Sequence, residues 1–471
     1  ALWIAENQML KETEDIVHMQ LDFLPLKTNA YIVEGNALRI DWNDVVDKSK
    51  LSYIMGNPPF VGYSFQSREQ KADILSVYVD EKGVPYSTAG EVDYVAGWYF
   101  RAASLMQNSH IKTAFVSTNS ITQGEQAYNV WKPLYDRFNV NIEFAYRTFR
   151  WDSEASIKAH VHCVIVGFTD IQSSKKKLLF SENGSLTEVD NINAYLIPAQ
   201  NIFINNRSKP LCSVAEMTNG NKPADGGNLF LTPEERDELL SVEPGAAPYI
   251  KRVYGSVEYI NDKLRYCLWL KNIDPGELRK LPNVLSRVEK VKEFRLNSPK
   301  AATQKSAEVP TLFQQIRQPD TNYIIVPRVS SQNRRYVPMG FISPDIIVTD
   351  SVQFIPDANL YEFGVITSNV HMAWMRAICG RLKSDYRYSA KIVYNNFPWP
   401  APTEQQKDTI AKAAQAILDA RALYPKSSLA DLYDPLTMPP ELRKAHMAND
   451  RAVMQAYGMP SHNHHFKWWF E

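Results

Sequence analysis

The feature that most constrains the fold is a regular alternation of helix-like and strand-like patterns over the first 200 residues or so. Alternation of this kind builds a sheet of mainly parallel strands covered by helices, and ligands bind beyond the carboxyl ends of its strands. We therefore predict an α/β fold with one twisted, largely parallel sheet. The first predicted helix ends near residue 20, and two further helices are predicted over 94–106 and 126–138. The predicted strands cover 30–34, 51–55, 113–117, 142–146 and 162–168.

Length and composition predict about three folded domains. The chain has 471 residues, of which 44% are hydrophobic, and this is enough for several cores. Gly, Pro and Asn interrupt the rhythm at NGNKPADGGN, and three prolines in YNNFPWPAP precede a new helical pattern. We predict a first domain over 1–200, a mixed α/β second domain over 205–400 with strands at 323–326, 336–341 and 346–348, and a helical third domain over 403–471.

Several classes of protein do not fit the sequence. No apolar run reaches the roughly 18 residues of a membrane span, and the first ten residues lack the features of a signal peptide, so we expect a cytoplasmic protein without a membrane partner. The four cysteines are far apart, and neither a disulfide nor a metal site is expected. Because the chain opens with Ala inside a helix-like pattern, we expect it to be a fragment.

Charge is distributed unevenly although its sum is zero. Residues 1–170 carry 15 Lys and Arg against 21 Asp and Glu, whereas residues 281–400 carry 15 against 9. Phosphate neutralisation by Lys and Arg supplies most of the non-specific affinity of proteins for DNA. The basic excess therefore predicts that a polyanion binds the later segment.

The motif that carries chemistry is Gly56-Asn57-Pro58-Pro59-Phe60, directly after the apolar strand LSYIM. An exocyclic amine of a base is a poor nucleophile because its lone pair is delocalised into the ring. The Asn57 side-chain carbonyl and the Pro58 backbone carbonyl can each accept one hydrogen of such an amine, while Pro59 stiffens the loop and Phe60 stacks on the base. Stacking of this kind requires a base taken out of the duplex.

A plain proline turn is the alternative interpretation of this motif. The strand before it, the aromatic residue after it and an upstream partner favour the catalytic interpretation. The partner is Asn36-Ala37, after the predicted strand AYIVE, where Asn36 could bind the adenine edge of a cofactor. Taken alone, Asn36 is an ordinary turn residue, so this signal is weak.

These residues resemble the amino-methyltransferases that use S-adenosylmethionine. With FVSTNSITQGEQ, RVSSQNRRYVPMGF, CGRLKSDYRYSAKIVYNNFPWP and LADLYDPLTMPPELRKAH, the chain is similar over nearly its whole length to the MmeI-like methyltransferases of type IIL restriction-modification systems. The resemblance implies a partial Rossmann-like class I methyltransferase sheet, a target-recognition domain and a helical C-terminal domain. It also implies transfer of a methyl group from S-adenosylmethionine to adenine N6 in double-stranded DNA.

The sequence departs from the family in one respect. Family members carry a glycine-rich cofactor loop and an acidic ribose-binding residue before the strand of the catalytic motif, and neither stands in this sequence. Asn36, Ala37, Asn57 and Tyr94 would then form only part of a cofactor wall. We expect weak or no binding of S-adenosylmethionine by this chain alone, and the nuclease of some family members would lie elsewhere in a parent chain.

Two segments are candidate readers of DNA. The first contributes Ser330, Ser331, Asn333, Arg334 and Arg335, whose donors match phosphates and base edges, although a solvated hairpin turn is the alternative. In the second, Lys383 and Asp385 share a face if the backbone is extended, and Arg387 follows. Lys donates to guanine and Asp accepts from cytosine, so this pair would suit one G·C base pair, with a surface ion pair as the alternative.

Three functions compete at this point. The leading one is site-specific adenine methylation within a restriction-modification system. The second is a catalytically silent DNA-binding specificity module, which the absence of the glycine-rich loop would favour. The third, methylation of RNA or of a glutamine amide, can use the same motif, but the large basic recognition domain argues against it.

Overall fold

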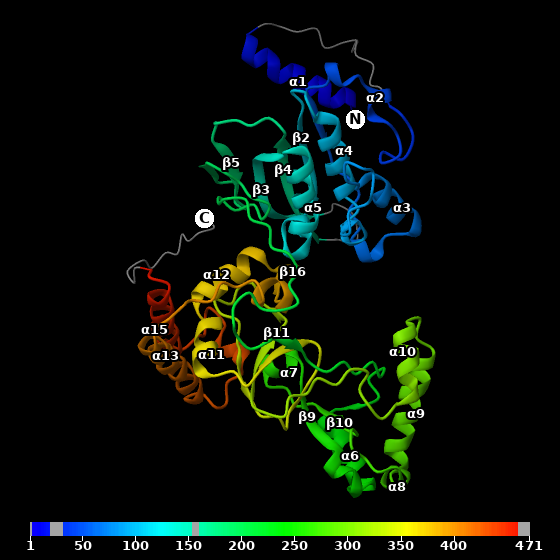
Figure 1. The fold of residues 1–471 in the computed structure, drawn as a ribbon, viewed down its shortest axis with the longest axis vertical. Coiled ribbons are helices and arrows are strands. Elements are labelled where there is room, and N and C mark those ends of the chain that lie inside the picture. The colour runs from blue at the N-terminus through cyan, green and yellow to red at the C-terminus, as the bar shows by residue number, and fades with distance from the viewer. Residues whose placement is uncertain (1, 19–31, 153–159, 460–471) are drawn as a thin grey trace. The chain divides into compact units, whose positions relative to one another are not determined.

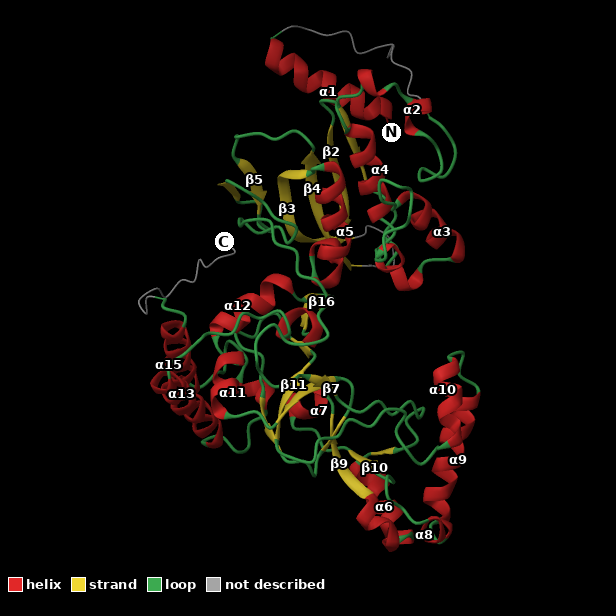
Figure 2. Ribbon diagram, viewed as in Figure 1, coloured by secondary structure: helices red, strands yellow, loops and turns green. Residues whose placement is uncertain are grey.

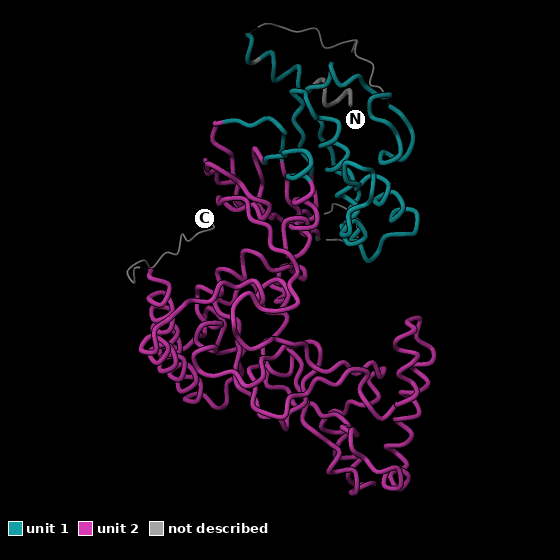
Figure 3. Tube along the Cα trace, viewed as in Figure 1, with its two compact units in different colours: residues 1–115, 134–141, 167–173 teal, residues 116–133, 142–166, 174–471 magenta. Residues whose placement is uncertain are grey.

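The computed structural model describes residues 2–18, 32–152 and 160–459. The chain divides into two compact units, shown in different colours in Figure 3. Unit 1 comprises residues 1–115, 134–141 and 167–173, and unit 2 comprises residues 116–133, 142–166 and 174–471. Each unit is described by itself below.

Unit 1 is mainly helical around the first strand. Ser67 and Gln70 form a capping box that starts α3, so the start of this helix is encoded locally. Helix α4 is apolar on most sides and largely buried, as a helix inside a core must be. The elements are α1 (Leu2–Val17), α2 (Trp42–Val45), β1 (Tyr53–Gly56), α3 (Arg68–Val77), α4 (Ala96–Met106) and short 3-10 turns at Lys48–Lys50, Tyr63–Phe65 and Ala89–Glu91.

One sheet of six strands has the order β1-β2-β4-β3-β5-β6. Its β1–β2 and β3–β5 pairs are parallel, and its β5–β6 pair is antiparallel. The predicted α/β fold is thus confirmed, with an antiparallel hairpin at one edge. The further elements are β2 (Lys112–Thr118), a 3-10 turn (Asn119–Thr122), α5 (Gly124–Phe138), β3 (Asn141–Asp152), β4 (His160–Thr169), β5 (Lys177–Phe180) and β6 (Leu186–Val189).

The strand predicted at residues 30–34 was wrong in the part that the structure describes. Residues 32–34 have no regular structure, and Ile32 and Val33 are exposed. The chain instead turns at Asn36, whose carbonyl accepts the backbone N–H groups of Arg39 and Ile40. A short apolar run without a partner strand forms no ladder, so its β-propensity is not expressed.

The middle of unit 2 is mixed α/β with many short strands, as predicted (Figure 2). Its sheets have the orders β14-β9-β10-β8, β13-β11-β15-β7 and β12-β17-β16. The strands are β7 (Thr218–Asn219), β8 (Phe230–Leu231), β9 (Ile250–Tyr254), β10 (Tyr266–Leu268), β11 (Tyr323–Pro327), β12 (Val329–Ser330), β13 (Gly340–Ile342), β14 (Ile347–Val348), β15 (Val352–Pro356), β16 (Gly380–Leu382) and β17 (Asp385–Arg387). The helices are α6 (Pro233–Val242), α7 (Ser256–Asn261), α8 (Pro275–Arg279), α9 (Pro282–Leu296), α10 (Ala301–Lys305), α11 (Leu360–Ile366), α12 (Asn369–Ile378), 3-10 turns at Pro244–Tyr249 and Ser306–Glu308, and a π-helix (Ala390–Tyr394).

The predicted helical C-terminal region is present as α13 (Glu404–Ala422), α14 (Leu429–Leu432) and α15 (Pro440–Ala456). Helices α13 and α15 pack side by side (Figure 1). Thr403 and Gln406 form the capping box that starts α13, and Ala414 and Ile417 are buried as its periodicity predicts. These helices share a core with residues of the middle region, including Tyr336. Residues 460–471 of the predicted third domain lie outside the described residues.

The strand predicted over 336–341 is shorter than expected, because β13 begins only at Gly340. The preceding residues are held by the C-terminal helices instead of by a ladder. The Tyr336 hydroxyl donates to Asp450 at 2.6 Å, and Arg421 donates to the carbonyl of Met339 at 2.5 Å. Side-chain partners thus satisfy polar groups that strand pairing would otherwise engage.

Candidate catalytic loop and nucleic-acid interface

The candidate catalytic motif, residues 56–60, leaves the sheet at the carboxyl end of β1. Strand β1 pairs in parallel with β2, and Gly56 is its last residue. Pro58 is buried, whereas Asn57 is exposed and its amide forms no hydrogen bond within the described residues. The loop is therefore anchored through Pro58 and presents a free amide where ligands of α/β sheets bind.

The segment after this motif, residues 61–66, is hydrogen-bonded to residues 92–94. The backbone N–H of Tyr94 donates to the Val61 carbonyl at 2.9 Å, and the N–H of Tyr63 donates to the Asp93 carboxylate at 3.0 Å. The Gln66 amide, which is buried, donates to the Val92 carbonyl at 2.9 Å. Backbone and side-chain bonds thus fix the chain that leaves Phe60, which favours a rigid loop.

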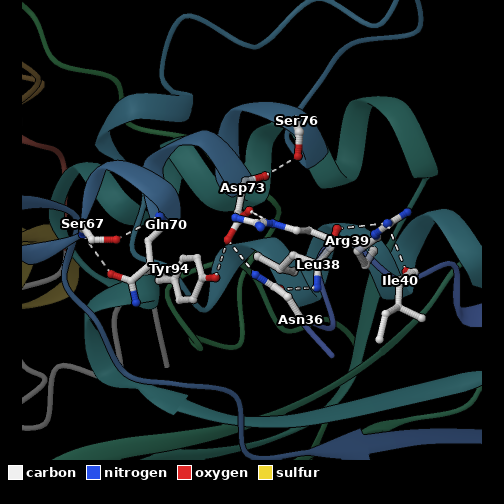
Figure 4. Close-up of polar contacts among 10 residues, drawn as sticks. Asn36, Leu38, Arg39, Ile40, Ser67, Gln70, Asp73, Ser76 and Tyr94 are labelled. Carbon is white, nitrogen blue, oxygen red and sulfur yellow. Dashed lines mark hydrogen bonds and ion pairs between the residues drawn. The ribbon is translucent and has the colours of Figure 1, made fainter. Parts of the chain in front are cut away.

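A polar cluster around Asp73 holds the turn that contains Asn36 (Figure 4). Asp73, which is 4% exposed, accepts from Asn36 Nδ2 at 2.8 Å, from Arg39 Nε at 2.6 Å and from the Tyr94 hydroxyl at 3.0 Å. Burial alone would raise the pKa of this carboxyl group. The hydrogen bonds from Arg39, Asn36 and Tyr94 outweigh it, so the pKa is lowered and the carboxylate is ionised at neutral pH.

Asn36 is thus already partly engaged. Its Oδ1 accepts the backbone N–H of Leu38 at 2.9 Å, and the Ala37 carbonyl accepts from the Trp42 indole at 2.8 Å. An amide has two N–H donors and two acceptor lone pairs, so one of each remains available on Asn36. The contact of Asn36 and Ala37 with a cofactor stays a prediction, with Asp73 now orienting the amide.

Tyr94 was predicted from the sequence as part of a cofactor wall, but Asp73 and Arg39 were not identified as members of the same polar cluster. Asp73 lies in the middle of helix α3, where a charged residue is usually solvated. The capping box of Ser67 and Gln70 signals the helix, but no local pattern signals that Asp73 faces the Asn36 turn.

The two candidate DNA-reading segments lie together in one three-stranded sheet. Strand β12 pairs with β17 through Val329–Arg387 and Ser330–Tyr386, and β16 completes the sheet. The backbone N–H of Gln332 donates to the Asp385 carboxylate at 3.3 Å. Segments about 50 residues apart in sequence thus form a single surface, which we call the recognition sheet.

The extended backbone that would place Lys383 and Asp385 on one face is not present at Lys383. Leu382 pairs with Asp385, so Lys383 and Ser384 form the two-residue turn of a hairpin, and Lys383 has a φ of 57°. An extended backbone would have placed Lys383 and Asp385 on one face, but a left-handed turn residue does not follow that alternation. Lys383 is exposed and Asp385 is half-buried.

The expected contact of Ser330 with DNA also needs correction, because its side chain is only 3% exposed. Ser331 instead forms a turn by accepting the backbone N–H groups of Asn333 and Arg334. Burial lowers the pKa of Arg334, and the nearby Asp385 opposes that effect. Arg335 is exposed, and its guanidinium lies over the ring of Tyr336 at 5.5 Å.

Metal ligands, cysteines and membrane-spanning helices are the other features that could carry function. In the described part of the chain, no group of three or more His, Cys, Asp or Glu could hold a metal ion, and the four cysteines are free thiols. No described helix is both long and apolar enough to cross a membrane.

The candidate motif after a parallel strand and the separate recognition sheet are the arrangement expected of a DNA methyltransferase that carries its own target-recognition region. Family models match in the same order: the MmeI DNA-methyltransferase domain over residues 1–181, the MmeI target recognition domain over 198–401 and the MmeI C-terminal domain over 402–464. The chain belongs to the MmeI family.

Two relatives support this assignment. DNA methyltransferase A of Bacillus subtilis (strain 168) is 40% identical over 461 residues, which cover 97% of this chain and 51% of that protein. The structure of the type IIL restriction-modification enzyme MmeI in complex with DNA matches with a TM-score of 0.89 and 44% identity, covering 98% of this chain and 61% of that one. The chain thus spans between half and two thirds of their lengths.

Proposed function

We propose that this chain carries the methyl-transfer loop and the target-recognition region of a site-specific DNA methyltransferase that modifies adenine N6 in double-stranded DNA, within a restriction-modification system. The observation that carries the proposal is the catalytic motif at the end of β1, with an exposed, unpaired Asn57 next to a buried Pro58. The family assignment and the DNA in the MmeI structure support the substrate class.

In this proposal, Asn57 Oδ1 and the Pro58 carbonyl accept the two hydrogens of the adenine amine. The nitrogen lone pair, less delocalised into the ring, would then form a bond to the methyl carbon while the bond of that carbon to the cofactor sulfur breaks, and the nitrogen would lose one proton to give a neutral methylamine. Phe60, which is half-buried, stacks on the flipped base, and Pro59 restricts the loop. No covalent intermediate on the chain is needed.

S-adenosylmethionine, when bound, supplies the methyl group. The residues of this chain fit one edge of it: Asn36, Ala37 and Asn57, with Asp73 orienting the Asn36 amide. The 471 residues contain no glycine-rich loop ahead of β1. We therefore expect this polypeptide by itself to bind S-adenosylmethionine weakly and to be inactive alone.

DNA recognition is assigned to the recognition sheet and its loop. Asn333, Arg334, Arg335 and Arg387 supply donors for phosphates and base edges, and Lys383 with Asp385 is proposed to read a G·C pair. In this proposal Lys383 contacts the base edge from the tip of the hairpin, where it is exposed and its backbone is not extended. A nuclease, if a parent protein has one, would act outside the residues of this chain.

The test uses a methylation-competent protein that contains this chain, with labelled S-adenosylmethionine and duplex DNA. Asn57→Ala should lower methyl incorporation by about 100-fold or more, as expected when a group that contacts the reacting amine is lost. Asn43→Ala is the matched control, because Asn43 is an exposed Asn of unit 1 outside the loop, and it should leave the rate unchanged.

A catalytically silent specificity module is the second candidate, favoured by the absence of the glycine-rich loop from this sequence. Calorimetric titration with S-adenosylmethionine of this chain and of a version extended upstream, together with a DNA-binding assay, distinguishes the two candidates. Both predict weak binding by the chain alone, and only the methyltransferase predicts binding by the extended form. DNA binding without methyl transfer in any protein that contains this chain would support the silent module. Methyl transfer that depends on Asn57 would exclude it.

A further inference from the structure

Exposed cationic residues also occur beyond the recognition sheet, on residues 205–211 and on the π-helix Ala390–Tyr394, which together we call the platform. After β17 the chain forms the π-helix Ala390–Tyr394, and this segment lies beside residues 205–211, which precede the first short strand of the middle region. The backbone N–H of Arg207 donates to the Lys391 carbonyl at 3.1 Å. Two cations that are 184 positions apart in sequence are thereby held next to one another.

The platform is braced by two asparagines. Asn395 Nδ2 donates to the Arg207 carbonyl at 2.8 Å, and the Asn395 carbonyl accepts from the N–H of Leu211 at 2.7 Å. Asn396 Nδ2 donates to the carbonyls of Asn205 and Lys391 at 3.0 and 2.9 Å. Both cationic positions therefore sit on backbone that side-chain amides fix, and π-helical turns are frequent at functional sites.

No ion pair engages Arg207 or Lys391 within the described residues, and the Glu125 carboxylate beside them accepts from Asn206 Nδ2 at 2.7 Å. The side chains of Arg207 and Lys391 are exposed, and within the described residues neither forms an ion pair or a hydrogen bond. Arg387, four residues before Lys391, is also exposed. Burial lowers the pKa of Arg328, and the charge of Arg387 lowers it further, so these two like charges lie close together. Like charges that converge repel one another unless an anion neutralises them.

We propose that Arg207 and Lys391 bind phosphates of the DNA backbone beside the bases that the recognition sheet reads. The inference rests on the proposed DNA binding and adds residues from the 205–211 segment and the π-helix. Cations on a fixed backbone set the register of the protein on the duplex without reading sequence. The braced pair thus positions the recognition sheet, whose Lys383 and Asp385 carry the sequence preference.

Duplex DNA is favoured as the occupant because Lys391 of the platform follows Arg387 of the recognition sheet by four residues, and donors and an acceptor suited to base edges occur together in that sheet. An acidic protein would not need that arrangement.

The experiment measures the affinity of this chain for an arbitrary duplex of about 30 base pairs as a function of salt. Each phosphate contact contributes a slope of about −0.9 in log affinity against log salt concentration. Arg207→Ala and Lys391→Ala should each make the slope shallower by about 0.9, and the double variant by about 1.8. Lys391→Arg, which keeps the charge, should restore the slope.

Lys426→Ala is the matched control, because Lys426 is another exposed lysine without a partner among the described residues. Its slope should equal that of the unchanged chain. A steep slope in the unchanged chain with no change in the double variant would overturn the inference and leave the proposed function intact. Failure of the unchanged chain to bind the duplex at low salt would overturn the proposed function itself.

Discussion

Replacing the buried carboxylate Asp450 by Asn should not destabilise the protein at neutral pH. Asp450 on α15 accepts from the Tyr336 hydroxyl at 2.6 Å and from the backbone N–H of Asn369 at 2.8 Å, and it is 4% exposed. An Asn side chain can satisfy both partners, since its oxygen accepts the N–H and its NH₂ group donates to the hydroxyl. Asp450→Asn therefore removes a buried charge and keeps the hydrogen bonds.

The expected change in the free energy of unfolding follows from the pKa of Asp450. Burial raises this pKa from its ordinary value of 3.8 to about 6, although the hydrogen bonds from Tyr336 and Asn369 oppose the shift. Because the folded pKa lies above the unfolded one, Asp450 favours the folded state below about pH 4, and that contribution is lost as the pH rises through about 6. The difference of about two pH units corresponds to roughly 3 kcal/mol.

The assay is urea denaturation of the unchanged chain, Asp450→Asn and Asp450→Ala between pH 4.5 and 8. Asp450→Asn should gain stability relative to the unchanged chain as the pH rises, by up to about 3 kcal/mol at pH 8. At pH 4.5, where Asp450 is mainly protonated, Asp450→Ala should lose about 2–4 kcal/mol, because it leaves the Tyr336 hydroxyl and the Asn369 N–H buried without acceptors. A pH-independent loss in Asp450→Asn that equals the loss in Asp450→Ala would refute the reasoning.

Three further predictions concern other buried polar groups. Asp73→Ala should destabilise the Asn36 turn by about 2–4 kcal/mol, because three donors lose their acceptor, and hydrogen exchange at Leu38 should accelerate if this is correct. Burial lowers the pKa of His371 to about 3, so its contribution to stability is present above pH 6.5 and is lost on acidification at about 1.4 kcal/mol per pH unit. His371→Gln should flatten the acid side of the denaturation profile, and an unchanged slope would contradict this assignment. Arg295 is fully buried and donates to five backbone carbonyls, whereas a Lys side chain has only three donors. Arg295→Lys should therefore lower the free energy of unfolding in urea by roughly 2–5 kcal/mol. A decrease below about 0.5 kcal/mol would contradict this prediction.

Much of the fold was predictable because its signals are local. The strand before Gly56 and the helix that begins with the Thr403–Gln406 capping box were both placed from short-range patterns. The position of the proposed catalytic motif after a strand was predictable for the same reason, since the apolar run that precedes it is a local pattern. The two DNA-reading segments could be listed, but their pairing in one sheet through Ser330 and Tyr386 depends on tertiary structure.

What sequence reasoning missed depends on contacts between distant residues. Lys383 and Asp385 were expected to share a face if the backbone is extended, yet the pairing of Leu382 with Asp385 forces a two-residue turn at Lys383. Asp73 and Arg295 look like solvated helix charges, but loops from elsewhere in the chain bury them. Burial of a charge is decided by what packs on it, and no periodicity records that.

The most direct test of the central claim is the identity of the nucleoside that a methylation-competent protein containing this chain produces. DNA methylated with labelled S-adenosylmethionine would be digested to nucleosides and analysed by mass spectrometry, with Asn57→Ala in parallel. The account predicts N6-methyladenine from the unchanged protein and almost none from the variant. A label on cytosine, or N6-methyladenine that persists at the same level in Asn57→Ala, would contradict it.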